Sequence, residues 1–257
     1  MHYQIREFTC LSAGNLLWGE AFVPEAPGRL PVLICSHGFN VTHRHFHPLA
    51  ERFVQEGYVC VCFDFAGGSV NGRSQGSSLE MSVFTERQNL MDVLETVRGW
   101  DFVDPERVFL LGESLGGSVT AITAPFVAEK IRGVVLAFPA FCLPADGYEQ
   151  FPTVEDLPDS FEMLGMTIGK VYLQDFYEGY DFYEEIVGYQ GPVLLVHGTE
   201  DPLVNPSYSV KAARVYANCE LHWIDGAGHG FYAPEYKALY YSYVAAFLTR
   251  CQSSARP

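Results

Sequence analysis

The sequence has no pattern typical of a secreted, membrane-spanning or metal-binding protein. Its first ten residues have no basic stretch followed by an apolar one, so we expect no signal peptide. No apolar run approaches the roughly 18 residues of a membrane span, and we expect no membrane partner. The seven cysteines form no C-x-x-C motif or Cys/His cluster, so we predict no metal site. Free cysteines without an export signal are typical of a cytoplasmic protein.

Basic residues are also scarce. Lysine and arginine number 16 against 31 acidic residues, which gives a formal net charge of −15. A nucleic acid would be repelled by such a surface, and we expect no nucleic-acid partner. We ascribe most of this charge to solubility, with a weaker bias toward neutral or cationic substrates. Because no P-loop or dinucleotide-binding motif is present, we expect no cofactor.

Short apolar runs alternate with amphipathic stretches along most of the chain. This alternation predicts an α/β fold with a mostly parallel central sheet and helices on both faces. In such a sheet the residues that follow each strand meet at one edge, where ligands bind. We expect strands over residues 30–35, 58–63, 108–111, 134–138, 193–197 and 221–224, and helices over 45–56, 85–100, 115–129, 206–216 and 236–250.

Residues 139–190 interrupt the alternation. The segment is longer than one crossover helix needs, is rich in aromatic and acidic residues, and contains one base, Lys170. It is too aromatic to be read as disordered. We predict that it is a cap inserted over the strand ends of a core domain formed by residues 1–138 and 191–257. A pair of ordinary crossover helices is the alternative.

The strongest chemical motif is Gly-Glu-Ser-Leu-Gly-Gly at residues 112–117, between a predicted strand and a predicted helix. It matches G-x-S-x-G, the sequence of a nucleophile elbow, in the structural context that the motif requires. Glycines on either side of the serine leave room for a tight turn. Ser114 is therefore the candidate nucleophile, and a glycine-rich turn without catalytic function is the alternative.

A serine hydroxyl needs a base, and the base needs a carboxylate to orient it. We assign the base to His229, in a glycine-rich loop after the last predicted strand, and the carboxylate to Asp201, after the strand at 193–197. The order Ser, Asp, His is the one expected for a nucleophile elbow of this kind. Glu200 and Asp225 are alternatives for the acid. The other histidines that could serve as base are less suitably placed in the chain: His37, His43, His45, His47, His197 and His222.

Acyl transfer also needs two donors for the developing oxyanion. We predict that these are the backbone N–H of Leu115, directly after the nucleophile, and that of Phe39, in the loop after the first predicted strand. In the same region, we expect His37 to make structural hydrogen bonds and Asp64 to accept hydrogen bonds that fix a loop.

These motifs together resemble the serine esterases of the α/β-hydrolase superfamily. The resemblance rests on His-Gly-Phe at 37–39, the Ser114 elbow, His-Gly-Thr-Glu-Asp at 197–201, and Gly-His at 228–229, and it spans nearly the whole chain. Within the superfamily the chain is most similar to bacterial feruloyl or cinnamoyl esterases and to their monoacylglycerol-lipase-like relatives. Ser-His-Gly-Phe at 36–39, the length and place of the cap, and Val-Tyr-Leu at 171–173 carry that closer similarity.

The similarity implies cleavage of hydroxycinnamate esters, with polar groups of the cap holding the phenolic ring. It makes Tyr172 a candidate substrate contact and Asp146 a second one. Two positions depart from the usual pattern of these esterases, because Glu113 and Leu115 stand where they have His and Gln. The loop after Asp64 is also longer than theirs.

We therefore predict a serine carboxylic ester hydrolase that acts through an acyl-enzyme on aromatic or short acyl esters. Its expected partner is a small-molecule ester, and a homodimer is left open. The alternatives are a serine peptidase or amidase and a monoacylglycerol-lipase-like enzyme of the same fold. A more remote one is a non-catalytic binding protein on a hydrolase fold.

Overall fold

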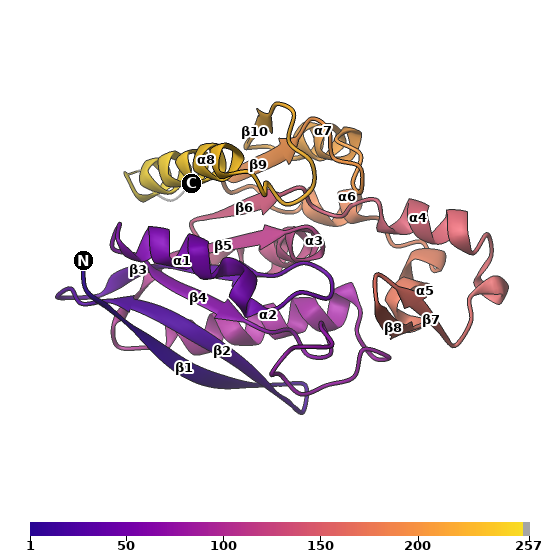
Figure 1. The fold of residues 1–257 in the computed structure, drawn as a ribbon, viewed down its shortest axis with the longest axis horizontal. Helices are drawn as coiled ribbons and strands as arrows, with labels where there is room; N and C mark the ends of the chain where they lie inside the picture. Colours follow the sequence, from indigo (N-terminus) through magenta and orange to yellow (C-terminus); the bar gives the residue numbers. More distant parts are fainter. Residues whose placement is uncertain (254–257) are drawn as a thin grey trace.

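The computed structural model of the protein describes residues 1–253 and is built around one large sheet (Figure 1). Its eight strands run in the order β1-β2-β4-β3-β5-β6-β9-β10. The strands are β1 (Tyr3–Ser12), β2 (Asn15–Pro24), β3 (Leu30–Ser36), β4 (Val59–Phe63), β5 (Val103–Glu113), β6 (Gly133–Ala137), β9 (Val193–Gly198) and β10 (Cys219–Ile224). All pairs from β4 to β10 are parallel, whereas β1 and β2 are antiparallel to their neighbours. The predicted α/β fold with a mostly parallel sheet is confirmed.

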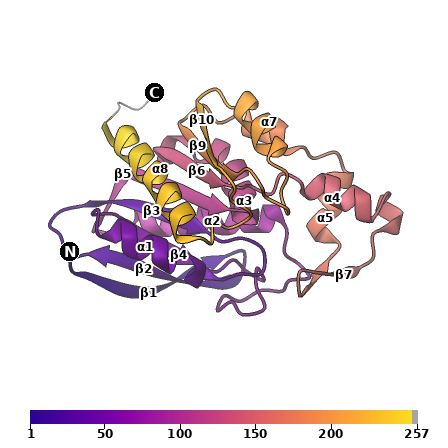
Figure 2. The same cartoon turned by 45° about the horizontal axis from the view of Figure 1, so that its top comes forward.

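Helices cover both faces of the sheet. On one face lie α1 (His47–Val54) and α8 (Pro234–Ser253), and on the other α2 (Val83–Arg98), α3 (Leu115–Thr123) and α7 (Ser207–Val215) (Figure 2). Side chains of a strand point alternately to the two faces. In β3, Val32 and Ile34 therefore enter the core under α2 and α3, while Leu33 and Cys35 enter the core under α1 and α8. Burial on both faces explains why these strands are continuous apolar runs.

The N-terminal hairpin of β1 and β2 was not predicted. Its strands pair from Tyr3 with Pro24 to Ser12 with Asn15, around a turn in which Ala13 and Gly14 both have positive φ. That backbone suits the twist of a two-residue hairpin, but alanine is a poor turn signal. Most side chains of β1 are exposed, so the strand lacks the apolar run that identified the central ones.

The helix expected over residues 115–129 is shorter than predicted. It ends at Thr123, and two 3-10 turns follow, η2 (Ala124–Phe126) and η3 (Ala128–Lys130). Pro125 explains the difference, because proline has no N–H to continue the helix and disfavours helical geometry in the residue before it.

Residues 139–190 form α4 (Leu143–Gln150), η4 (Val154–Asp156), a separate hairpin of β7 (Ser160–Met163) and β8 (Met166–Gly169), α5 (Val171–Tyr177) and α6 (Phe182–Ile186). In Figure 1, α4, α5 and the hairpin project at the right-hand end of the molecule, away from α8. The hairpin contacts loops of the sheet: Asn40 Nδ2 donates to Leu164 O (3.0 Å), and Ser78 Oγ to Thr167 O (2.7 Å). The assignment of this segment as a cap stays a prediction.

All seven cysteines are free thiols, and six of them are buried. Within residues 1–253, no helix combines the length and the apolar character needed to cross a membrane.

Candidate functional site

Ser114 occupies a sharp turn between β5 and α3. Its backbone has φ 55° and ψ −121°, and its N–H donates to Ala137 O on the neighbouring strand (3.0 Å). A Cβ atom at Gly112 would lie 2.1 Å from Gly116 O, and one at Gly116 would lie 2.1 Å from Ser36 O. The two flanking glycines therefore let α3 begin so close to β5 and β3. The turn holds the serine in a strained conformation, as a nucleophile elbow does.

The structure brings the three predicted residues of the triad together. His229 Nε2 lies 3.0 Å from Ser114 Oγ, and His229 Nδ1 lies 2.8 Å from Asp201 Oδ2. The residues come from the loops after β5, β9 and β10, which meet because the C-terminal ends of parallel strands share one edge of the sheet. The ring of Phe138 packs edge-on against the imidazole, at 4.6 Å between ring centroids. The three side chains are placed for proton transfer from serine to histidine.

Asp201 is held as a carboxylate. Burial disfavours its charged form, but hydrogen bonds from His197, His229 and the N–H of Val204 outweigh burial and lower its pKa. The N–H groups of Leu203 and Val204 both donate to Oδ1 at 2.9 Å, which leaves Oδ2 to face His229. An ionised acid in this position fixes the imidazole tautomer and stabilises an imidazolium.

The alternatives to Asp201 lie elsewhere. Glu200 is exposed, and Asp225, also exposed, accepts a hydrogen bond from Thr199 Oγ1 (3.2 Å).

His197 has a position that the sequence did not reveal. The sequence reading treated it only as a rival for the base, whereas its buried ring lies 3.2 Å from Asp201 Oδ2 through Nε2. Its Nδ1 is 2.6 Å from Ser209 Oγ, so the ring is fixed at both nitrogens. The one sequence signal was its place four residues before Asp201. His197 therefore helps to position the carboxylate rather than to act as base.

The predicted oxyanion donors flank Ser114. A Cβ atom at Gly38 would lie 3.2 Å from Ser114 Cβ, so the loop that carries Phe39 packs directly on the serine. Leu115 is the first residue of α3, where an N–H has no acceptor within its helix. Among residues 1–253, no group outside helix α3 accepts a hydrogen bond from either N–H. Both donors are thus unengaged beside the candidate nucleophile.

His37 has a structural position beneath this loop, in agreement with expectation. Its Nδ1–H donates to Gly38 O (2.8 Å), and its Nε2 accepts the N–H of Phe65 from the next loop (3.1 Å). Burial lowers the pKa of His37 from 6.5 to about 4, with the hydrogen bond to Gly38 acting in the opposite direction. The neutral ring therefore ties the Phe39 loop to the loop after β4.

Asp64 fixes the neighbouring loop, also as expected. It accepts hydrogen bonds from the N–H of Arg73 and from both the N–H and the ring Nδ1 of His43. Burial would raise its pKa, but these donors lower it. The other ring nitrogen of His43 belongs to a group of three candidate metal ligands with Glu20 and His47. The sequence reading, which predicted no metal site, did not identify this group.

The two predicted substrate contacts occupy different environments. Tyr172, on α5, is buried and packs edge-on against Phe39, at 5.7 Å between ring centroids. Within the described residues its hydroxyl has no hydrogen-bond partner. Asp146, on α4, is exposed. Burial raises the pKa of Tyr172, and the charges of Glu86, Cys142 and Asp146 add to the effect. Tyr172 thus links the segment 139–190 to the oxyanion loop, whereas Asp146 lies at its surface.

Glu86 was missed by the sequence analysis. It lies on α2, is 1% exposed, and neither of its carboxyl oxygens has a hydrogen-bond partner among residues 1–253. Burial raises its pKa well above the usual value. A Cβ atom at Gly68 would lie 3.1 Å from its Oε1 and 3.3 Å from the ring of His37. A carboxyl group whose protonated form is favoured by burial therefore lies close to the oxyanion loop, and only the folded packing reveals it.

Solved structures match this fold closely. Est1E from Butyrivibrio proteoclasticus, solved with ferulic acid bound, superimposes with a TM-score of 0.86 over 96% of this chain and 100% of that chain, at 23% sequence identity. The mouse Alpha/beta hydrolase domain-containing protein 10 superimposes with a TM-score of 0.79 over 95% of this chain and 99% of that one, at 17% identity. At these identities the comparison establishes the α/β-hydrolase fold.

Curated relatives match at low identity. Alpha/beta hydrolase domain-containing protein 17C of Xenopus laevis is 26% identical over 219 residues, which cover 82% of this chain and 60% of that protein. The Quorum-quenching protein AidA of Acinetobacter baumannii is 32% identical over 96 residues, 37% of this chain and 31% of that one. This chain thus aligns with about a third of the length of the second relative and three fifths of the length of the first. The model of the Prolyl oligopeptidase family matches residues 44–254, most of the chain, and this α/β hydrolase belongs to that family.

Proposed function

We propose that the protein is a serine carboxylic ester hydrolase. The observation that carries the proposal is the continuous path from Ser114 Oγ through His229 to Asp201, with contacts of 3.0 and 2.8 Å. The strained backbone of the serine and the two unengaged N–H groups beside it support the same reading. A structural serine would need none of these features.

The proposed reaction has two halves. Ser114 Oγ attacks the ester carbonyl carbon while His229 Nε2 takes the hydroxyl proton, and the N–H groups of Phe39 and Leu115 face the oxyanion. The imidazolium, stabilised by Asp201, gives this proton to the departing alkoxide, which leaves as an alcohol. A water molecule then gives a proton to His229 and attacks the acyl-enzyme. The acid is released, and the serine recovers its proton.

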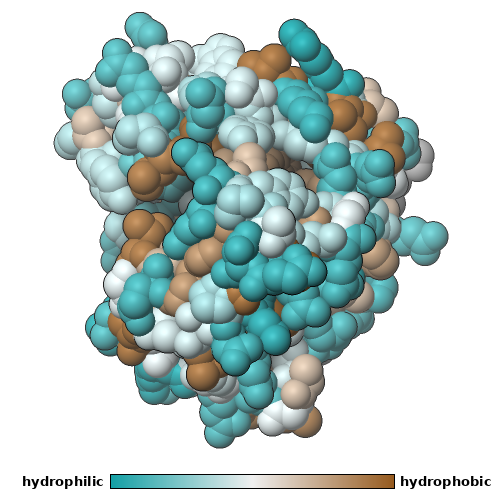
Figure 3. All heavy atoms as spheres, turned by 90° about the vertical axis from the view of Figure 1, so that its right-hand side faces the viewer, coloured by the Kyte–Doolittle hydropathy of each residue, from teal (hydrophilic) through white to brown (hydrophobic). Residues whose placement is uncertain are grey.

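The substrate we propose is an ester with an aromatic or short acyl group. Tyr172 and Phe39 place two aromatic rings next to the oxyanion loop, which suits a flat apolar acyl group. The hydroxyl of Tyr172, which has no partner among the described residues, is able to donate a hydrogen bond to a phenolic group of the substrate or to accept one from it. Est1E, which shares this fold, has been solved with ferulic acid bound. Seen from the side of α4, α5 and the β7–β8 hairpin, hydrophobic residues form scattered groups among hydrophilic ones (Figure 3).

A peptidase or amidase is the second candidate. The family's name favours a peptide substrate. The acidity of residues 139–190, whose one base is Lys170, favours a substrate with a free amino group. A panel of methyl ferulate, p-nitrophenyl acetate, p-nitrophenyl butyrate and aminoacyl p-nitroanilides separates the two candidates. We expect kcat/KM to be highest for an ester. An anilide as the best substrate would assign the protein to the second class.

The experiment that tests the chemistry replaces the nucleophile. Ser114→Ala should reduce kcat on p-nitrophenyl acetate by about a thousandfold or more, because the residues of a triad act as a unit. Ser118→Ala is the matched control: it lies one turn further along α3, is buried, and its hydroxyl has no hydrogen-bond partner within residues 1–253. We expect the control to retain activity. A fluorophosphonate probe should label the wild type and not Ser114→Ala. Retained turnover or labelling in Ser114→Ala would contradict the assignment, and an unlabelled wild type would favour a non-catalytic binding protein.

A further inference from the structure

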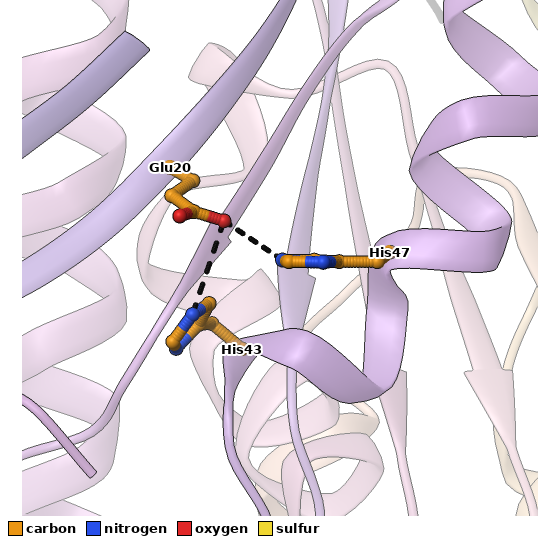
Figure 4. A group of neighbouring side chains, drawn as sticks. All are labelled: Glu20, His43 and His47. Carbon is orange, nitrogen blue, oxygen red and sulfur yellow. Dashed lines mark ion pairs between the residues drawn. The ribbon is translucent and has the colours of Figure 1, made fainter. Parts of the chain in front are cut away.

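A second group of chemically active side chains lies outside the proposed site. Glu20 comes from β2, His43 begins η1 (His43–Phe46) and His47 begins α1, and the three side chains point toward one another (Figure 4). Glu20 Oε2 lies 2.7 Å from His47 Nε2 and 3.8 Å from His43 Nε2. All three ligand atoms lie within 4.8 Å of one another. One carboxylate oxygen and two imidazole nitrogens therefore converge on one point.

The tautomer of His43 leaves its inner nitrogen free to bind. Its Nδ1 is 2.9 Å from Asp64 Oδ1, and a carboxylate oxygen accepts hydrogen bonds, so Nδ1 is the nitrogen that carries the N–H of this contact. In that tautomer the lone pair lies on Nε2, which faces Glu20 and His47 (Figure 4). His43 is 2% exposed, so solvent does not satisfy this nitrogen. A carboxylate that holds the second nitrogen of a ligand histidine is a common feature of metal sites in proteins.

Hydrogen bonds alone do not satisfy the cluster. None of the three converging atoms has a hydrogen-bond partner within residues 1–253, although all three are buried. The separation between Glu20 and His43 is too long for a hydrogen bond, and the shorter contact to His47 has the distance of an ion pair without hydrogen-bond geometry. Protonation of the rings would leave the Nε2–H of His43 without an acceptor. A cation between the three atoms would satisfy all of them.

We propose that Glu20, His43 and His47 bind a divalent transition-metal ion of the zinc class, and that Asp64 orients His43. Two imidazole nitrogens and one carboxylate oxygen are ligands that zinc prefers. Tetrahedral ligands about 2.0–2.1 Å from zinc lie about 3.3 Å apart, between the two separations from Glu20. With neutral histidines, the charges of Glu20 and Asp64 balance a dication.

A water molecule would take the fourth coordination position of such an ion. The side chains of His47 and Glu20 are 30% and 16% exposed, which gives the ion a path from solvent. The bound ion would join β2 of the N-terminal hairpin to the segment that follows the oxyanion loop. It would therefore stabilise the folded chain, because the unfolded chain does not hold these ligands together. The proposal does not depend on the reaction assigned to Ser114.

The test measures zinc binding to the 257-residue chain. Chelator-treated wild-type protein is titrated with Zn²⁺ against a chromophoric chelator, and thermal unfolding is recorded with and without the ion. Glu20→Gln and His47→Gln alter ligands with partly exposed side chains, and circular dichroism confirms that the variants fold. His222→Gln is the matched control, because His222 lies 3.2 Å from the carboxylate of Glu220 at the surface but belongs to no group of three ligands among the described residues.

We expect one Zn²⁺ per wild-type chain and a rise in Tm on binding. Glu20→Gln and His47→Gln should each weaken binding about tenfold or more and reduce the rise in Tm, while His222→Gln matches the wild type. Binding of Co²⁺ should produce visible absorption that Glu20→Gln weakens. Unchanged binding in both ligand variants would overturn the proposal, as would loss of binding in His229→Gln alone, which would place the ion at the triad. Failure of the wild type to bind zinc would also overturn it.

Discussion

Acidification should destabilise the protein through one buried histidine beneath the oxyanion loop. The pKa of His37 in the folded chain is about 4, and in the unfolded chain it returns to 6.5. Between these values the unfolded chain binds a proton that the folded chain does not, so the free energy of unfolding falls as pH falls. The stabilising effect of the neutral ring is complete above pH 6.5 and is lost as pH falls toward 4.

The size of the effect follows from the two pKa values. One pKa unit corresponds to about 1.4 kcal/mol, so the fall from 6.5 to about 4 corresponds to about 3 kcal/mol of unfolding free energy. The unfolding free energy of a typical protein is about 5–15 kcal/mol, so this contribution is a large share of it. Asp64 and Asp201 have lowered pKa values in the folded chain. Their contribution to stability is therefore lost only as pH falls below the usual aspartate pKa of 3.8, outside this pH window.

His37→Gln removes the titration and keeps an oxygen that can accept the N–H of Phe65. Urea unfolding of wild type and variant is measured in steps from pH 7.5 to 4. At pH 7.5 the variant should be less stable by about 1 kcal/mol, because it loses the hydrogen bond to Gly38. The wild type should then lose about 3 kcal/mol more than the variant, so the two curves cross. His222→Gln, which alters a histidine at the surface, should follow the wild type. Parallel curves for wild type and His37→Gln would refute the reasoning.

Three further predictions concern Tyr172, the buried acid Glu86, and the pair of His45 and Glu113 beside Ser114. Tyr172→Phe should raise KM for methyl ferulate about fivefold, the effect of one hydrogen bond of about 1 kcal/mol, and leave KM for methyl cinnamate unchanged; an equal change for both esters would contradict a contact with the phenolic group. Because burial raises the pKa of Glu86, its contribution to stability is present below the unfolded value near 4.5 and is lost as pH rises through the folded one. Glu86→Gln should therefore be more stable than wild type at pH 8 in urea unfolding, and a less stable variant would show that the carboxylate has a partner. Burial lowers the pKa of His45, but the charge of Glu113 and its hydrogen bond outweigh burial and raise it. His45→Gln should thus cost stability at pH 5.5 and less at pH 9, whereas an equal cost at both pH values would show that the pair is not ionic.

The parts of the fold that could be predicted are those buried on both faces. Strands such as Val193–Gly198 are continuous apolar runs because helices cover both of their sides. The two hairpins were missed for the opposite reason. Strand β1 is largely exposed, and β7 and β8 have four residues each, too few for a clear alternation. In these elements the pairing partner, rather than a local pattern, determines the structure.

The residues of the candidate site also fall into two groups, those that could be predicted from the sequence and those that could not. Ser114, Asp201 and His229 could be placed from sequence because each lies within a few residues after a predicted strand, and parallel strands end at one edge. His197, Glu86 and Glu20 could not, because their significance lies in which atoms they face or fail to face across the packed core. A buried glutamate without a partner has no signature in a single sequence.

Anchoring of the Phe39 loop connects these observations. His37 ties the loop to Phe65, and Asn40 bonds on three sides: its N–H donates to Gly68 O, its Oδ1 accepts the N–H of Val70, and its Nδ2 donates to the β7–β8 hairpin. Oxyanion donors lower a reaction barrier most when they are already oriented, because little reorganisation is then needed as charge develops. The loop is held by the loop after β4 and by the segment 139–190 together. Asn40→Ala, which removes two of the three bonds, should therefore lower kcat on p-nitrophenyl acetate more than it raises KM. An increase in KM alone would show that the loop binds substrate without positioning the donor.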